Sequence, residues 1–238
     1  GNGKRTALIY DSPITGNKNK FSYEELRSKV SIFAGGLKEN GVNKGDRVII
    51  YMPMIPEAVI AMLACARIGA IHSVVFGGFA SNELASRIDD SKAKLLITAS
   101  CGFEPGRTVE YKPLVDEAIK QAKHKVDKMI LFQRTGHEVK LNAPKEVSWE
   151  EVVSNAKGID CVEMNSNDFS YILYTSGTTG TPKGIVRDIG GHIVALKWTM
   201  KNIYNINEGD IWWSASDIGW IVGHSYIVYA PLFKGCTT

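Results

Sequence analysis

The sequence contains little cysteine, and its four cysteines lie far apart at positions 65, 101, 161 and 236. None of them forms a C-x-x-C pair, and none joins histidines at the spacing of a zinc site. The pattern therefore predicts no zinc centre. We expect reduced and mostly buried thiols, which are typical of an intracellular protein.

Long apolar runs and charge of one sign are also missing. No stretch approaches the ~18 consecutive apolar residues that a membrane-spanning helix needs, so we expect no membrane span. The 28 basic and 25 acidic residues nearly balance at a net charge of +3, and the basic residues are scattered. This balance predicts no dedicated nucleic-acid surface. At 238 residues the chain is long enough for a sizeable core in one or two domains.

Histidine is scarce too, and its placement predicts no catalytic triad. Four of the five histidines have no Ser or Asp partner at a useful spacing. We expect the fifth, His224, to pack or to form hydrogen bonds rather than to act as a base. The pair Asp89-Asp90 is expected at a solvated helix end.

Helix signals and apolar runs alternate along the chain. Ser22 and Glu25 form a capping box that predicts a helix ending at Asn40-Gly41, and Pro56 opens a helix that ends before Gly69. Further helices are expected at 82–88, 111–123, 191–202 and 223–233, with a short one after the capping box at 148–151, and strands at 47–51, 71–75, 94–99, 128–132, 170–174 and 210–214. This alternation predicts an α/β fold with layered, mainly parallel sheets flanked by helices.

Residues 174–184, with the sequence YTSGTTGTPKG, form the most informative segment. Glycines let backbone N–H groups turn toward an anion, hydroxyl groups add donors, and lysine adds a positive charge. The segment is therefore predicted to bind phosphate. The residues assigned to ATP phosphates are Thr175, Ser176, Gly177, Thr178, Thr179, Gly180 and Lys183.

Two other interpretations of this segment are weaker. A flexible Ser/Thr/Gly linker would not normally lie between two apolar runs, and it would not need the stiff Pro182 beside Lys183. The segment is also not a Walker A loop, because Lys183 is followed by Gly184 instead of Ser or Thr. An ordinary P-loop kinase or GTPase is therefore disfavoured.

The segment 174–184 resembles the phosphate loop of the acyl-adenylate-forming enzymes. Two further segments, 62–79 and 217–226, resemble blocks of acetyl- and propionyl-CoA synthetases, and the similarity extends over essentially the whole chain to their short-chain, propionate-preferring branch. Such enzymes are more than twice this length. The resemblance thus implies that residues 1–238 are a partial N-terminal (AMP-binding) domain, truncated at its C-terminal end. It also implies that the segments recognising adenine and ribose lie past Thr238.

The resemblance implies an ATP-dependent acyl-CoA synthetase, an AMP-forming acid–thiol ligase. It would activate propionate or acetate as an acyl-adenylate and transfer the acyl group to coenzyme A, in the cytoplasm or the mitochondrial matrix. Lys183 and Thr175 are the expected catalytic residues. The expected partners are small molecules: the carboxylate, ATP and coenzyme A, with magnesium (Mg²⁺) as counter-ion of the phosphates. No magnesium ligand and no oligomeric state follow from the sequence, and the segment alone is expected to be inactive.

By the same resemblance, Trp220, Ile221 and Val222 form the wall of the acyl pocket. Acetyl-CoA synthetases commonly have threonine where this chain has Val222, so a more apolar pocket and a preference for propionate are expected. One methylene group gives only ~1–3 kcal/mol of discrimination, so some use of acetate is also expected. For Trp212 and Trp213 we expect ordinary core packing.

A third segment, Glu104-Pro105-Gly106-Arg107, is on its own a surface turn. In related synthetases the matching loop contacts the nucleotide end of coenzyme A with two arginines, and here only Arg107 matches, while Glu104 replaces the other. Arg107 can bind a phosphate in a bidentate geometry. Gly77-Gly78 is either a close approach to the same ligand or a plain turn.

Two alternatives remain at this point. The chain could be a non-catalytic nucleotide- or phosphate-binding module. It could also belong to an adenylating ligase that passes its acyl group to a carrier protein, although the loop at 104–107 favours free coenzyme A.

Overall fold

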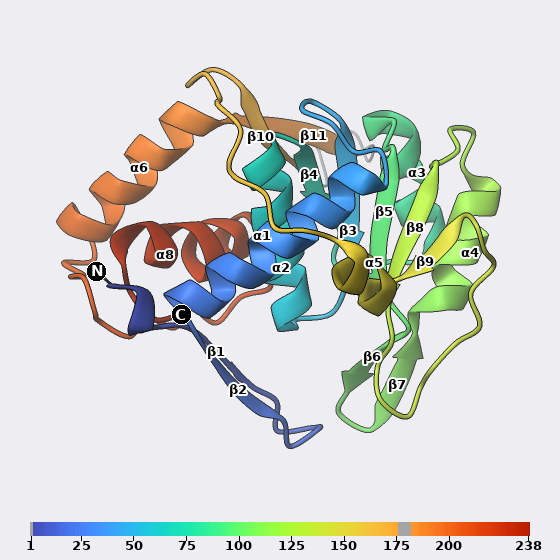
Figure 1. The fold of residues 1–238 in the computed structure, drawn as a ribbon, viewed down its shortest axis with the longest axis horizontal. Helices are drawn as coiled ribbons and strands as arrows, with labels where there is room; N and C mark the ends of the chain where they lie inside the picture. Colours follow the sequence, from blue (N-terminus) through green and yellow to red (C-terminus); the bar gives the residue numbers. More distant parts are fainter. Residues whose placement is uncertain (1, 176–181) are drawn as a thin grey trace.

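The computed structural model describes residues 2–175 and 182–238 (Figure 1). Its centre is a seven-stranded sheet with the order β11-β10-β4-β3-β5-β8-β9. All neighbouring strands are parallel except β11, which pairs antiparallel with β10. The strands are β3 (Arg47–Tyr51), β4 (Ile71–Val74), β5 (Leu95–Ala99), β8 (Lys128–Phe132), β9 (Glu146–Ser148), β10 (Phe169–Thr175) and β11 (Lys183–Asp188). The predicted mainly parallel α/β fold is confirmed.

Helices cover both faces of this sheet, and the strand residues alternate between two cores. Val48 and Ile50 of β3 pack in one core with helices α1, α2 and α5, whereas Ile49 and Tyr51 pack in the other with α3 and α4. The helices are α1 (Tyr23–Glu39), α2 (Pro56–Ile68), α3 (Ser81–Ser91), α4 (Tyr111–Gln121), α5 (Trp149–Asn155) and α6 (Ile189–Asn202). Burial on both faces explains why these strands are continuously apolar in the sequence.

The helix ends follow their local signals closely. The Ser22 hydroxyl accepts a hydrogen bond from the Glu25 amide, and the Glu25 carboxylate accepts one from the Ser22 amide, which completes the capping box at the start of α1. Pro56 begins α2, and Gly69 ends it with a φ of 69° in the left-handed region. Ser148 caps α5 by accepting from the Glu151 amide.

The last helical segment differs from the uniform helix predicted at 223–233. It consists of α7 (Ile221–Gly223), the π-helix η2 (His224–Tyr229) and α8 (Ala230–Lys234). Backbone hydrogen bonds in a π-helix span five residues instead of four, and no sequence signal marks this change.

The strand predicted at 210–214 is wrong, because Ile211 forms only one isolated parallel bridge, with Thr237. The expectation of core packing for the two tryptophans within this segment is half correct. Trp212 packs against Tyr204, and its indole N–H donates to the Tyr226 carbonyl at 2.7 Å. Trp213 does not pack in the core, since 82% of its surface is exposed.

Three small elements lie outside the main sheet and were not predicted. They are the short 3-10 helix η1 (Asn2–Lys4), the antiparallel pair β1 (Thr6–Asp11) with β2 (Lys18–Ser22), and the antiparallel pair β6 (Cys101–Glu104) with β7 (Arg107–Glu110). In Figure 1 both hairpins extend from the same side of the molecule. The C-terminal residue Thr238 lies beside β1, where its amide donates to the Ala7 carbonyl at 2.9 Å.

Cys65, Cys101 and Cys236 are buried free thiols and Cys161 is an exposed one, as expected for mostly buried reduced cysteines. Among the helices that the structure describes, none combines the length and the apolar character that crossing a bilayer requires.

Candidate active site

The two ends of the segment predicted to bind phosphate lie side by side at the carboxyl end of β10. In the antiparallel pairing of β10 with β11, Thr175 is the direct partner of Lys183, and Tyr174 is the partner of Gly184. Thr175 and Lys183 are both exposed. A hydroxyl donor and a positive charge therefore stand next to each other. The predicted phosphate-binding residues Ser176, Gly177, Thr178, Thr179 and Gly180 lie outside the described residues.

Tyr174 enters this segment with its ring buried and its hydroxyl bonded. The hydroxyl donates to the Asp90 carboxylate at 2.6 Å. Burial raises the pKa of Tyr174, and the hydrogen bond to Asp90 raises it further, so the phenol stays protonated at neutral pH. Asp90 is exposed, as expected of a helix end, but through Tyr174 it also holds β10, a role that no local pattern indicates.

The predicted acyl wall lies at the start of the last helical segment. Trp220 is the N-cap residue of α7, and Ile221 and Val222 form its first turn. All three side chains are partly exposed, at 44%, 40% and 45%. The Trp220 ring lies 5.5 Å from the ring of Phe76 and 6.0 Å from that of Phe79. The structure thus joins two segments that are about 140 residues apart in the sequence.

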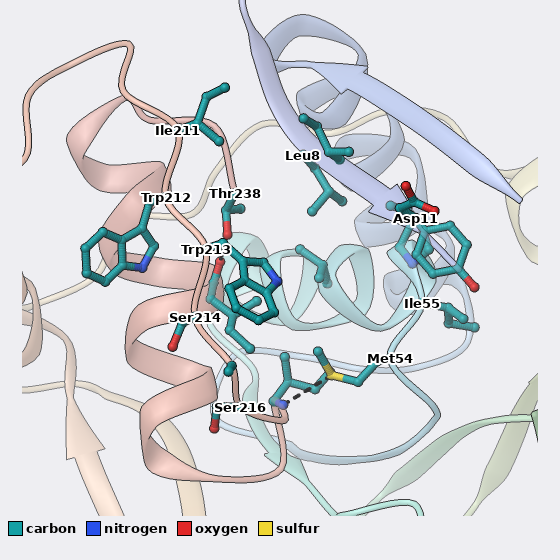
Figure 2. A pocket seen from close by; sticks show the side chains of 17 residues that line it. Leu8, Asp11, Met54, Ile55, Ile211, Trp212, Trp213, Ser214, Ser216 and Thr238 are labelled. Atoms are coloured by element: carbon teal, nitrogen blue, oxygen red, sulfur yellow. Dashed lines mark hydrogen bonds between the residues drawn. The ribbon is translucent and has the colours of Figure 1, made fainter. Parts of the chain in front are cut away.

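An apolar cavity of about 390 Å³ lies apart from these residues, between β1, the start of α2 and the segment 211–218 (Figure 2). Its lining includes Met54, Ile55 and Trp213, and the Met54 sulfur accepts a hydrogen bond from the Ile218 amide at 3.3 Å. None of the predicted site residues lines it. Among the described residues that line it, only Asp11 and Tyr10 have titratable side chains, so it offers little for phosphate chemistry.

The segment predicted to contact coenzyme A is the turn between β6 and β7. Pro105 and Gly106 connect the strands, and Gly106 has a φ of 77°, which glycine adopts without steric cost. Glu104 and Arg107 face each other as strand partners, and their side chains form an ion pair at 2.7 Å. Both side chains are substantially exposed. Such a pair contributes little stability, so an incoming phosphate could compete for the guanidinium group.

Packing explains the two glycines before Phe79, and a Cβ atom at Gly78 would lie 2.5 Å from the Phe76 ring. A Cβ atom at Gly77 would lie 2.1 Å from the Tyr111 hydroxyl oxygen, and one at Gly102 would lie 2.8 Å from the same atom. The Gly77 carbonyl also accepts a hydrogen bond from the Tyr51 hydroxyl at 3.2 Å. Tyr111 therefore needs glycine on both sides, in the loop after β4 and in strand β6.

The interior beside β10 holds a cluster of three buried histidines, His72, His192 and His224. His72 Nε2 lies 2.6 Å from the Tyr229 hydroxyl, and His192 Nε2 lies 3.2 Å from the Tyr171 hydroxyl. Burial lowers the pKa of His192 and of His224 to about 4. These side chains are neutral at pH 7 and packed in the core, which confirms the packing role expected for His224.

No group of three or more His, Cys, Asp or Glu side chains within residues 2–175 and 182–238 is arranged to hold a metal ion. The residues that sequence reasoning missed are Arg87 and Asp90 of α3, which contact Tyr174. Their only sequence signal is the helical spacing of three to four residues, which many solvent-facing charged residues share.

Comparison with known proteins places these features in a family. The family described as AMP-binding enzyme matches residues 1–238. The human mitochondrial acyl-CoA synthetase short-chain family member 3 is 55% identical over 239 residues, which cover 100% of this chain and 35% of that protein. An acetyl-coenzyme A synthetase of Photobacterium profundum is 45% identical over 238 residues, covering 99% of this chain and 37% of its own length.

A solved structure supports the fold. The crystal structure of an acyl-CoA synthetase of Brucella canis has a TM-score of 0.83 and 24% identity, and the match covers 99% of this chain and 40% of that one. The chain spans little more than a third of the length of the curated relatives named above. Because the family match extends from the first residue to the last, this chain belongs to the AMP-binding enzyme family.

Proposed function

We propose that residues 1–238 are part of an ATP-dependent short-chain acyl-CoA synthetase, as a partial N-terminal AMP-binding domain. The carboxylate would displace pyrophosphate from ATP to give an acyl-adenylate, and the thiol of coenzyme A would then displace AMP. The observation that carries this proposal is the pairing of Thr175 with Lys183 at the carboxyl end of β10. Carboxyl ends of parallel strands are where open α/β sheets bind ligands.

Formation of the acyl-adenylate requires charge stabilisation and positioning of the substrates more than it requires a general base. A short carboxylic acid is already ionised at neutral pH, so no side chain has to remove its proton. The buried neutral histidines are consistent with a reaction that needs no general base, because they are packed in the core. Transfer at a phosphorus atom builds negative charge on the phosphate oxygens, and fixed donors stabilise it. Thr175 would supply a hydroxyl donor and Lys183 a positive charge.

The test is carboxylate-dependent exchange of pyrophosphate into ATP by the full-length protein, with acids of two to five carbons. We expect exchange with propionate, and an about 100-fold slower rate for Lys183→Ala. Lys201→Ala is the matched control, because Lys201 is exposed on α6, outside the proposed site. Unchanged exchange in Lys183→Ala would remove the lysine from the site. ATP binding without exchange would favour a non-catalytic nucleotide-binding module instead.

The choice of acid is proposed to depend on Trp220, Ile221 and Val222. Their apolar side chains are exposed, and the Trp220 ring lies beside Phe76 and Phe79. We expect propionate to be used better than acetate, and Val222→Thr to move the preference toward acetate. One methylene group corresponds to about 10- to 200-fold in selectivity at most. Turnover of acetate equal to or above that of propionate would contradict this part.

The acceptor is proposed to be coenzyme A, held partly by the β6–β7 turn. Arg107 projects from this turn with most of its side chain exposed. Arg107→Ala should raise the KM for coenzyme A while leaving the pyrophosphate exchange unchanged, because exchange does not involve the thiol. An unchanged KM would remove the turn from the site, and transfer to a carrier protein alone would favour the other type of ligase.

Magnesium is proposed as the counter-ion of the ATP phosphates. Magnesium usually keeps several waters and binds through one or two carboxylates together with substrate phosphates. The described residues provide no cluster of ligands for it. We therefore assign it no protein ligand and derive no step from it.

A further inference from the structure

Helix α3 presents a buried arginine to the region between the two parts of the proposed site. Arg87 is 4% exposed although it carries a full positive charge. Its Nη1 atom donates to the carbonyl and to the carboxylate of Glu83, both at 2.7 Å. Burying a charge is costly unless it is paired and hydrogen-bonded. The fold therefore keeps Arg87 in one place with a partner on its own helix.

The guanidinium group of Arg87 contacts two aromatic rings that come from different segments. Its central carbon lies 4.7 Å from the centre of the Phe79 ring and 5.3 Å from the centre of the Tyr174 ring. Both distances are within the range of a cation–π contact. A planar guanidinium stacks on aromatic faces in a way that a lysine ammonium group does not.

Each of these two rings leads to a different part of the proposed site. Tyr174 immediately precedes Thr175, and its hydroxyl is fixed on Asp90 of the same helix α3. Phe79 meets Trp220 edge to face, with an angle of 88° between the rings and 6.0 Å between their centres. A continuous series of contacts thus runs from Trp220 through Phe79 and Arg87 to Tyr174.

We propose that Arg87 is a positioning residue that sets the geometry of the phosphate-binding end of β10 and of the acyl wall together. It touches neither ATP nor the carboxylate in this proposal, and acts through Tyr174 and Phe79. The inference rests on the proposed function, because it assigns the two ends of the series to ATP and to the carboxylate. Small displacements of positioned groups impair catalysis strongly, so the loss of Arg87 should be visible in the kinetics with both substrates.

The experiment compares Arg87→Met with Arg47→Met in the full-length protein. Arg47 is a matched control because it also holds α3, by donating from Nε to the Ser91 carbonyl at 2.8 Å, but it contacts neither aromatic ring. We expect Arg87→Met to raise the KM for ATP and for propionate in pyrophosphate exchange about tenfold each. Arg47→Met should lower the melting temperature and leave both KM values unchanged. Arg87→Lys should be intermediate.

Two further variants test the Tyr174 end and the Phe79 end of the series separately. They also provide a test if Arg87→Met does not fold. Tyr174→Phe removes only the hydroxyl bonded to Asp90 and should raise the KM for ATP more than that for propionate. Phe79→Leu removes the ring beside Trp220 and should raise the KM for propionate more than that for ATP. This split is a result that a general loss of stability would not produce.

The outcomes distinguish the inference from the function on which it rests. Exchange by the wild type with equal KM values in the wild type and in Arg87→Met overturns the role of Arg87 alone. So does an equal rise of KM in Arg87→Met and Arg47→Met, or no split between Tyr174→Phe and Phe79→Leu. Absence of exchange in the wild type with every acid of two to five carbons overturns the proposed function and the inference together.

Discussion

The buried histidines predict that the protein loses stability as the pH falls below neutrality. Burial lowers the pKa of His192 and of His224 from 6.5 to about 4, and it lowers the pKa of His72 as well. A folded-state pKa below the unfolded value means that the unfolded chain takes up protons first. The stability from these groups is therefore complete above about pH 6.5 and is lost as the pH falls toward 4.

The size of this loss of stability follows from the pKa shifts of His192 and His224. Between pH 7 and pH 5, a histidine whose pKa drops from 6.5 to about 4 on folding loses about 2 kcal/mol of stability, so His192 and His224 together lose about 4 kcal/mol. Buried carboxyl groups act in the opposite direction, because burial raises the pKa of Glu57 and of Asp217. The difference between a variant and the wild type isolates the histidine contribution.

The assay is thermal unfolding at pH 7 and pH 5 at constant ionic strength. About 1 kcal/mol corresponds to about 2–4 °C for a domain of this size. The variant His192→Gln removes one of the two groups, so its loss of melting temperature between pH 7 and pH 5 should be smaller than that of the wild type by about 4–8 °C. His137→Gln changes an exposed histidine and is the control. Equal losses in His192→Gln and the wild type would refute the reasoning.

Three further predictions concern packing and the coenzyme A turn. Gly77→Ala places a Cβ 2.1 Å from the Tyr111 hydroxyl and should lower the melting temperature by about 2–8 °C, and adding Tyr111→Phe should restore part of it; additive losses would contradict the clash. Trp149→Ala removes a ring stacked 3.7 Å from Phe33 and should cost about 3–5 kcal/mol, measured by urea unfolding, whereas less than 1 kcal/mol would mean that this stack is unimportant. Glu104→Gln frees the Arg107 guanidinium and should lower the KM for coenzyme A a few-fold; a higher KM would show that the carboxylate helps binding.

The elements with local signals were predicted well because each signal acts within one turn of the chain. The capping box of Ser22 and Glu25, Pro56 at the start of α2 and Gly69 at its end each satisfy backbone groups of neighbouring residues. The central strands were recognisable because burial on both faces demands continuous apolar residues. No long-range contact was needed for these assignments.

The missed elements depend on contacts that no local pattern encodes. Strand β2, Lys18–Ser22, is largely polar and exposed, and its register is set by β1. Strand β11 was not predicted, because its apolar residues Ile185 and Val186 form a run too short to indicate a strand without its partner β10. The run at 210–214 looked apolar enough for a strand, but in the structure Ile211 and Trp213 point largely to solvent.

The candidate site also contains residues that a local motif predicts and residues that only long-range packing reveals. The motif at 174–184 names Thr175 and Lys183 by composition, and the register of β10 with β11 then brings them together. Arg87 and Asp90 could not be found in this way, because their relation to Tyr174 exists only once α3 packs beside β10. In the sequence they are ordinary charged residues of an amphipathic helix.

Helix α3 packs against Tyr174, the residue at which the glycine-rich motif begins. Glycine has no side chain with which to pack, so the geometry of a glycine-rich motif depends on how its flanking residues are held. On one side Tyr174 is held by Arg87 and Asp90, and on the other side Lys183 is held by its pairing with Thr175. Tyr174 and Arg87 are buried, whereas Thr175 and Lys183 are exposed at the end of the sheet. The donors at 175 and 183 therefore take their positions from α3 and the sheet, which is the preorganisation that the proposed function would require of them.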